Sequence, residues 1–560
     1  MDKGPFGDLL FFMLKLLAIL LLFQISEVSA RPSWAPSVSC QKAWSHLKES
    51  GLDKYQFETD SQITEQGNIG YQKYKKRVNR DNCSNKWTVL IYMAADNDLS
   101  AYSFWDLYEM ERKIKGELNL GASGDDIDVI VEWDNKKRNG LRRMHIFQSD
   151  KEYDSSLTKS DFEDMSEKEI LSPIVQLLPE VGPGSERDQS KRFQSFLQWG
   201  VENYPSDHYM VIVWGHGEGF IGQHYERRMR WEQMQNNSRR HERSRLLLRE
   251  DVRLELGQGA DRPSNYPVDK VFGGVAFDYS EMSFLDIPTT SKIIDNLVEW
   301  TLEGQKIDIL GFDACLMQSL EVSSQFISNS NFMFGSTQVQ NYLGLPYRSL
   351  IDQLHTGKST SEMAFEIPTL IEKSFREGYQ GAIDPEGQKT FTASSFNLEA
   401  LKYELLPALD DMSQALMDYL KEDSMRVIDL NFILEQNEAF QGETRDVGVF
   451  LGAILKLLYL EKESNGETET MYELHGEIIK SLSILHQMTL SRAYGDLYTT
   501  QVGREAQTYL LGYFKGLGVW IPRNAEQFEH RKKEFEQSLL WQSVPKWGQV
   551  LEMIYTEPEL

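Results

Sequence analysis

Residues 307–317 read IDILGFDACLM, an apolar run that ends in a turn carrying an aspartate and a cysteine. Residues 210–219 read MVIVWGHGEG and repeat this layout with a histidine in the turn. Continuous apolar runs of this length are typical of strands that are covered on both faces of a parallel sheet. Functional side chains collect just past the carboxyl ends of such strands. We therefore expect Cys315 and His216 to lie on one rim of a sheet.

Segments on either side of these two strands extend the pattern. Further strands are expected at 87–93, 127–133, 142–147 and 332–336, and helices at 100–115, 188–203, 289–303 and from Cys315 through Phe326. Strands that alternate with helices predict an α/β fold with a mostly parallel sheet flanked by helices. Helices dominate the rest of the chain, at 398–420, 447–460 and 471–490, before a short strand at 516–522. We therefore predict an α/β domain at 86–380 and a mainly helical C-terminal region at 381–560.

The first thirty residues have the layout of a secretory signal peptide. Lys3 precedes an apolar run at 9–23, and the segment ends in the small residues Val28, Ser29 and Ala30. An uncleaved anchor is the alternative, but about fifteen apolar residues are short for a span that needs roughly twenty. We expect cleavage after Ala30, a secreted or periplasmic protein, and no stable membrane span thereafter. Residues 31–85 read as a loosely structured lead-in.

The charge balance narrows the class of function. The chain has 85 acidic and 59 basic residues, which gives a formal net charge of -26. Binding to nucleic acid requires a surplus of Lys and Arg that neutralises phosphates. The sequence therefore predicts no nucleic-acid partner.

Cysteine is rare, which excludes a disulfide-dense scaffold or a zinc ribbon. The chain has three cysteines, Cys40, Cys83 and Cys315. In an oxidising compartment Cys40 and Cys83 could pair, and Cys315 would then be the odd thiol. A single cysteine is more often a buried structural residue than a reactive one. The sequence around Cys315 favours a reactive thiol.

The two turns together suit nucleophilic catalysis. A thiol at the start of a helix gains from the helix dipole, which favours the thiolate. A histidine across the cleft can assist the thiol and later protonate the leaving amine. Cys315 is thus the candidate nucleophile and His216 its assistant, with the backbone amides of Gly217 and Cys315 as candidate oxyanion donors.

Asp313 has two interpretations. A carboxylate that faced the sulfur would raise the pKa of the thiol, so its side chain should point elsewhere. It could form the floor of a specificity pocket and pair there with a Lys or Arg side chain of the substrate. It could equally be an ordinary aspartate that caps the following helix. Spacing alone leaves both open.

Three motifs in order give the chain a family resemblance. They are WTVLIYMAADNDL at 87–99, WGHGEG at 214–219 and FDACLM at 312–317. The chain resembles the clostripain family of cysteine peptidases (family C11), which shares a clan with caspases, legumains and gingipains. This implies a caspase-haemoglobinase-like fold for most of the mature chain.

The resemblance also implies roles for residues. His216 and Cys315 would form a catalytic dyad, and Asp313 would bind a basic side chain before the cleaved bond. Ser336 and Thr337 resemble the segment that lines this pocket, and Asp278 resembles the strand after the insertion. Relatives often have Asn at Gly215 and an aromatic residue at Leu345, and both departures lie near the cleft.

Two further family properties bear on regulation. Some relatives cleave themselves at a basic residue in a loop behind the histidine, and residues 223–267 here form an Arg-rich insertion at that place. A charged loop is more often plain solvated surface, so both interpretations of the insertion stay open. Some relatives depend on calcium, but no ligand cluster is evident, and Asp96 and Asp98 are expected to be turn formers.

The sequence therefore predicts an exported cysteine endopeptidase that cleaves protein or peptide substrates after Arg or Lys through a thioester acyl-enzyme. One alternative is a catalytically silent binding or adhesion protein that keeps the peptidase fold. Another is a zymogen that stays inactive until the Arg-rich insertion is cut.

Overall fold

A computed structural model describes residues 85–556 of the 560-residue chain. The described range omits residues 115–120, 125, 136–140, 150, 155, 158, 166–168, 173, 179–187, 221–272, 279–282, 342, 378–390, 437–443, 496–513 and 523. The predicted signal peptide, most of the lead-in, Cys40, Cys83 and the Arg-rich insertion all fall outside the described residues.

The described part of the chain is built on a nine-stranded sheet in the order β12-β10-β9-β8-β5-β1-β2-β3-β4. Five central strands, from β9 to β2, are parallel, and the strands at both edges are antiparallel. The strands are β1 (Asn85–Ala95), β2 (Ile127–Asn135), β3 (Leu141–His145), β4 (Ile174–Leu178), β5 (Ser206–Trp214), β8 (Ile307–Asp313), β9 (Ser330–Gly335), β10 (Thr392–Asn397) and β12 (Thr489–Tyr494). The predicted mostly parallel α/β sheet is confirmed.

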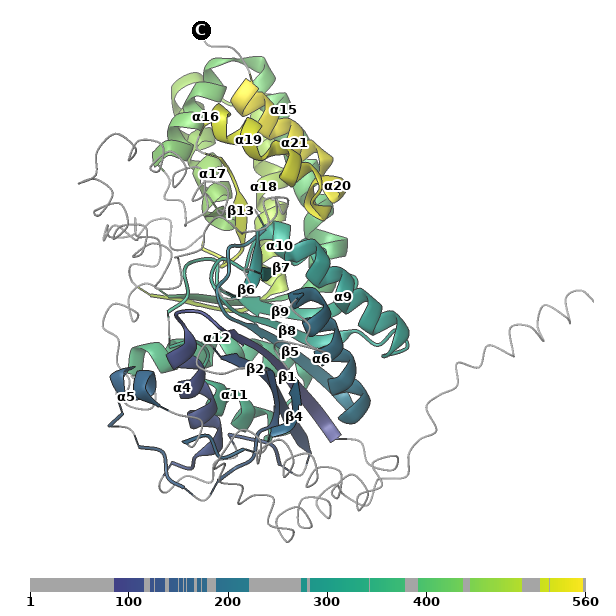
Figure 1. Cartoon of the computed structure of the whole chain (residues 1–560). Helices are drawn as coiled ribbons and strands as arrows, with labels where there is room; N and C mark the ends of the chain where they lie inside the picture. The colour runs from purple at the N-terminus through teal and green to yellow at the C-terminus, as the bar shows by residue number, and fades with distance from the viewer. Residues whose placement is uncertain are drawn as a thin grey trace, which may run out of the picture.

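Helices cover both faces of the sheet (Figure 1). One face carries α4 (Ser100–Glu111), α5 (Lys159–Asp164), α11 (Tyr347–Leu354) and α12 (Thr360–Glu377), and the other carries α6 (Gln189–Asn203), α9 (Ile287–Trp300) and α10 (Leu320–Gln325). Along β1, Val89 and Ile91 belong to the core under α4, whereas Leu90 and Tyr92 belong to the core under α6. Successive residues of a strand point to opposite faces, so a strand buried on both sides is apolar throughout.

Two short pairs of strands complete the sheet structure. β6 (Gly274–Asp278) and β7 (Ser283–Asp286) form an antiparallel hairpin, and β11 (Thr444–Asp446) pairs with β13 (Gly518–Trp520). β13 also contacts the α/β domain, because its Gly518 amide donates to the Gln318 carbonyl at 2.9 Å.

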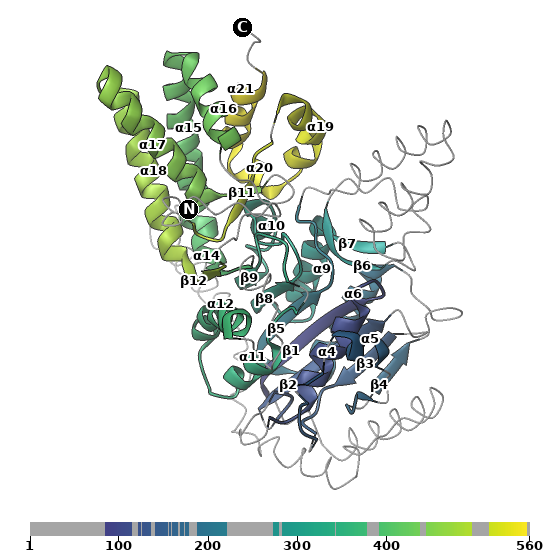
Figure 2. The same cartoon turned by 90° about the vertical axis from the view of Figure 1, so that its left-hand side faces the viewer.

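The C-terminal region is mainly helical (Figure 2). Its helices are α14 (Leu398–Ala400), the π-helix η6 (Leu401–Leu405), α15 (Leu406–Glu422), α16 (Met425–Gln436), α17 (Val447–Asn465), α18 (Glu469–Met488), α19 (Ala525–Glu536), α20 (Leu539–Ser543) and α21 (Pro545–Thr556). The sheet itself crosses the predicted boundary at residue 380, since β10 and β12 extend it beyond β9. Among the described helices, none combines the length and hydropathy needed to cross a bilayer.

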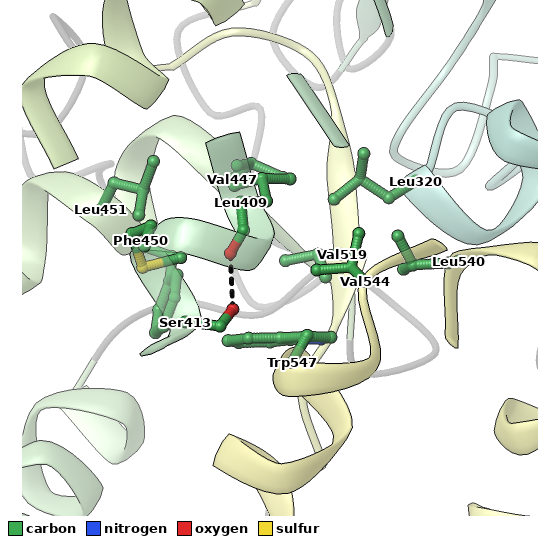
Figure 3. Close-up of a pocket in the computed structure, with 11 residues that line it drawn as sticks. Leu320, Leu409, Ser413, Val447, Phe450, Leu451, Val519, Leu540, Val544 and Trp547 are labelled. Carbon is green, nitrogen blue, oxygen red and sulfur yellow. Dashed lines mark hydrogen bonds between the residues drawn. The ribbon is translucent and has the colours of Figure 1, made fainter. Parts of the chain in front are cut away.

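A small cavity lies where α10 meets the C-terminal helices (Figure 3). Its apolar lining includes Leu320 from α10, Leu409 from α15 and Trp547 from α21. Its volume of about 20 Å³ would hold roughly one water molecule. The nearby Ser413 hydroxyl already donates to the Leu409 carbonyl at 2.6 Å. The cavity is therefore a gap in packing and too small for an organic ligand.

Candidate active site

The carboxyl ends of β1, β5 and β8 form the rim that carries the candidate site. β1 pairs in parallel with β2 on one side and with β5 on the other, so the strand order changes direction there. Ligands bind in the crevice that such a switch leaves past the strand ends. Trp214 at the end of β5 is in register with Asp313 at the end of β8. His216 and Cys315 each lie two residues beyond this pair, on neighbouring turns of one rim.

Cys315 lies in a tight turn directly after β8 and is partly exposed. Leu316 has a φ of 63°, in the left-handed region that residues with side chains rarely adopt. This turn interrupts the helix expected to begin at Cys315, and that prediction is wrong. α10 begins at Leu320 and is capped by Ser319, whose hydroxyl accepts from the Val322 amide at 3.3 Å. The thiol therefore does not lie at a helix N-terminus.

The segment after β9, residues 336–340, holds the cysteine turn in place. The Leu316 amide donates to the Gln338 carbonyl at 3.2 Å, and the Gln318 amide donates to the Ser336 carbonyl at 3.0 Å. The Gln340 amide then donates to the Cys315 sulfur at 3.3 Å. A donor at this position favours the thiolate over the thiol.

His216 faces an acidic partner from the turn after β1. Its Nε2 lies 2.6 Å from Oδ1 of Asp98, and the two side chains are 29% and 42% exposed. Asn97 fixes the turn that presents Asp98, since its side-chain amide donates to the carbonyls of Ala94 at 2.9 Å and Phe277 at 2.8 Å. From the sequence, Asp98 is expected only to form a turn. The structure adds a contact that orients the histidine ring.

Gly217 packs directly against the cysteine turn. A Cβ at this position would lie 2.4 Å from the Cys315 carbonyl oxygen and 3.1 Å from the Cys315 nitrogen. Any side chain at this position would therefore displace the cysteine turn. The histidine turn is supported from behind by β6, whose Ala276 amide donates to the His216 carbonyl at 3.0 Å.

Asp313, two residues before Cys315, is buried and only 5% exposed. Its Oδ1 accepts from the side-chain amide of Gln340 at 2.5 Å. Its Oδ2 accepts from the Tyr347 hydroxyl at 2.9 Å and from the Leu345 amide at 3.3 Å. The interpretation of Asp313 as a helix cap is wrong, because Ser319 caps α10. The buried carboxylate suits the floor of a pocket.

Burial and neighbouring acids raise the pKa values of Asp313 and of a nearby carboxyl group. Burial raises the pKa of Asp313 to about 6, although the hydrogen bonds from Tyr347 and Leu345 lower it. Burial also raises the pKa of Asp106 on α4 well above its ordinary value, and the charges of Asp313 and Glu109 add to this. Carboxylates this close disfavour joint ionisation, and an entering cation relieves their repulsion.

Ser336 and Thr337, predicted to line the pocket, use their hydroxyls for internal contacts. The Ser336 hydroxyl lies 2.8 Å from that of Thr392 on β10, and the Thr337 hydroxyl bonds the same group at 3.1 Å. Both residues are buried. They join the 336–340 segment to the sheet, and direct contact with substrate stays a prediction.

The possible calcium requirement rests on resemblance alone. Within the described residues, no group of three or more His, Cys, Asp or Glu side chains is arranged to hold a metal ion. Asp98 is engaged by His216, and Asp313 by Gln340, Leu345 and Tyr347.

The contacts that Asp98, Asp106 and Gln340 make at the site are not predicted from the sequence. The turn motif at 87–99 names Asp98 but gives no partner for it. Asp106 lies in a segment that the sequence predicts as an amphipathic helix, where an acidic residue usually indicates a solvated face, yet every residue of α4 is buried. Gln340 belongs to no motif, and its contacts join residues more than twenty positions apart in the chain.

Comparison with known proteins assigns the chain to a family. The model of the clostripain family (Peptidase_C11) matches residues 91–242 and 257–553, which is most of the sequence. The chain belongs to the clostripain family. It is therefore a cysteine peptidase, and protein or peptide substrates follow from this class.

Solved structures of C11 proteases match the chain at low identity. A secreted C11 cysteine protease from Bacteroides thetaiotaomicron, in complex with an irreversible peptide inhibitor, is 15% identical with a TM-score of 0.50, and the match covers 82% of this chain and 99% of that one. An inactive zymogen C11 protease from Parabacteroides distasonis is 14% identical with a TM-score of 0.49, over 82% and 98% of the two chains. No curated protein sequence matches the chain.

Proposed function

We propose that this clostripain-family member is an exported endopeptidase that cleaves after Arg or Lys, with Cys315 as nucleophile and His216 as its acid and base. The observation that carries the proposal is the pairing of Trp214 with Asp313, which sets both turns side by side above a buried carboxylate. A basic side chain at the P1 position, directly before the cleaved bond, would pair with Asp313.

The reaction then has two balanced halves. The Cys315 thiolate attacks the carbonyl carbon, and the amides of Gly217 and Cys315 stabilise the oxyanion. Protonated His216 gives its proton to the leaving amine, and a thioester remains. Neutral His216 then takes a proton from water, whose oxygen attacks the thioester, and the proton returns to the sulfur as the acid product leaves.

Asp98 is proposed to orient the histidine. It engages Nε2 at 2.6 Å, so the proton that His216 exchanges with thiol and substrate would be carried by Nδ1. A carboxylate at this position also stabilises the imidazolium that forms before the amine leaves.

Export and processing complete the proposal. The layout of residues 1–30 supports export, and the position of the Arg-rich insertion behind His216 supports self-cleavage within 223–267. Sequencing the N-termini of purified wild type and Cys315→Ala tests the second point. A new terminus within 223–267 in the wild type only would support it, and the same terminus in both proteins would contradict it.

Labelling of the thiol tests the proposed nucleophile and pocket together. An arginyl chloromethyl ketone should alkylate Cys315, as located by peptide mass spectrometry, and a leucyl analogue should react far more slowly. Reaction only after limited trypsin nicking would indicate the zymogen. No reaction even after nicking would favour the silent binding protein.

A further inference from the structure

Gln340 is the one residue described at the site that contacts both the nucleophile and the pocket floor. Its backbone amide donates to the Cys315 sulfur at 3.3 Å, and its side-chain amide donates to Asp313 Oδ1 at 2.5 Å. Gln340 therefore links the thiol to the buried carboxylate through its backbone and its side chain. If Asp313 binds the basic side chain of a substrate, that side chain has to displace the Gln340 amide from Oδ1.

The other hydrogen-bond partners of Asp313 are buried around its second carboxylate oxygen. Tyr347 is 0% exposed and Leu345 is 2% exposed, and both bond Oδ2. Gly344 closes the same side, since a Cβ there would lie 3.0 Å from Oδ2. Gln340 is only partly buried and bonds the other oxygen, so it is the partner that can move toward solvent.

We propose that Gln340 occupies the P1 site of the free protein, where its side chain covers Asp313 and must leave Oδ1 when a P1 side chain binds. This inference rests on the proposed role of Asp313 in binding Arg or Lys. A hydrogen bond to a charged carboxylate is stronger than one between neutral groups. A guanidinium or ammonium group replaces it with a charge pair, whereas an apolar P1 side chain breaks it without compensation. Both kinds of substrate therefore have to displace the amide, and only a cationic one replaces its hydrogen bond.

The two contacts of Gln340 can be tested separately, because one is made by its backbone and the other by its side chain. Gln340→Ala removes the side-chain amide but keeps the backbone N–H that faces the sulfur. The chemistry at Cys315 should therefore persist while the pocket opens. A structural defect in the segment would instead lower kcat for every substrate.

The test compares KM and kcat for peptides with Arg or Leu at P1. Gln340→Ala should lower KM for the arginyl peptide by about tenfold, the factor that corresponds to one net hydrogen bond, with kcat within about twofold of wild type. It should also raise kcat/KM for the leucyl peptide by a similar factor, because both peptides displace the same amide. Gln305→Ala is the matched control, because its amide donates to the Asp207 carbonyl at 2.8 Å near the amino end of β8. This control should leave both peptides unchanged.

A higher or an unchanged KM for the arginyl peptide would contradict the proposed role of Gln340. A higher KM for the arginyl peptide would mean that Gln340 helps to hold the cation, and an unchanged KM would mean that it does not occupy the pocket. Agmatine, a guanidinium ligand without a peptide bond, supplies a second readout as a competitive inhibitor that should bind Gln340→Ala more tightly. Asp313→Asn in the same assay separates the two proposals: if it keeps the arginyl preference, the proposed function fails whatever Gln340 does.

Discussion

Two aspartates reach the site from opposite sides, and their surroundings differ. Asp98 lies in an open turn and contacts His216 with 42% of its side chain exposed. Asp313 is buried, and burial raises its pKa to about 6. Exposed ion pairs contribute roughly 0–1 kcal/mol, because solvent screens them, whereas a buried carboxylate is costly until a partner neutralises it. The exposed aspartate can therefore orient a catalytic group, while the buried one can select a substrate.

The largest expected effect is the loss of this buried charge. Asp313→Asn should lower kcat/KM for arginyl peptides by roughly two to three orders of magnitude, since removing one member of a buried charge pair costs about 2–5 kcal/mol. Peptides with a neutral P1 residue should change little. The measurement is hydrolysis of matched fluorogenic peptides. Asp308→Asn, which alters a buried aspartate at the other end of β8, should not affect the preference.

The pH dependence of selectivity is the next largest effect. The pKa of Asp313 is raised to about 6, so the carboxylate is charged above that pH and neutral below it. The ratio of kcat/KM for arginyl and leucyl peptides should therefore fall about tenfold per pH unit below about 6. The ratio cancels the titration of groups that act on both peptides. A ratio that stays constant from pH 4.5 to 8 would contradict the role of Asp313.

A smaller effect is expected on the exposed side of the site. Asp98→Asn should lower kcat by about fivefold to tenfold with KM nearly unchanged, because it weakens an interaction that orients His216 but does not touch the pocket. The preference for Arg over Leu should persist. Asp154→Asn, an exposed aspartate that bonds Ser156, is the matched control. If Asp98→Asn changed the preference more than the rate, the contrast between the two aspartates would be wrong.

The smallest expected effect concerns stability where α10 contacts β13. Glu321 on α10 accepts from the Trp520 amide of β13 at 2.9 Å, and burial raises its pKa to about 7. A raised carboxyl pKa means that the folded state holds the proton more tightly. The resulting stability is present at low pH and is lost as the pH rises toward and past about 7.

Glu321→Gln should flatten this dependence, because the amide oxygen still accepts the hydrogen bond and carries no charge. Between pH 5 and pH 8, the melting temperature of Glu321→Gln should fall by about 2 °C less than that of the wild type. Glu463→Gln, on the exposed face of α17, should follow the wild-type curve. Equal slopes for Glu321→Gln and wild type would rule out a contribution from Glu321.

The sequence predicts the central strands of the fold better than the contacts between segments that are distant in the chain. Apolar runs such as 307–312 predict central strands, because a strand buried on both faces must be apolar throughout. The helix expected at Cys315 was wrong, since the left-handed Leu316 depends on hydrogen bonds to the segment after β9. β10 and β12 join the sheet from distant parts of the chain, and neither carries a strong local signal.

The residues of the candidate site also differ in how far the sequence predicts them. Cys315, His216 and Asp313 follow predicted strands inside recognisable motifs, so their place on the rim follows from topology. Gln340 and the contact of Asp98 with His216 depend on which loops meet across the cleft. No local pattern encodes that meeting, because it is decided by packing between segments far apart in sequence.

The most direct test of the account is hydrolysis of fluorogenic peptides that carry Arg, Lys, Asp or Leu before the bond, by wild type, Cys315→Ala and Asp313→Asn. We expect turnover of the Arg and Lys peptides by the wild type, no turnover by Cys315→Ala, and a selective loss of turnover of the basic peptides in Asp313→Asn. Turnover that survives Cys315→Ala, or a preference for Asp or Leu in the wild type, would contradict it.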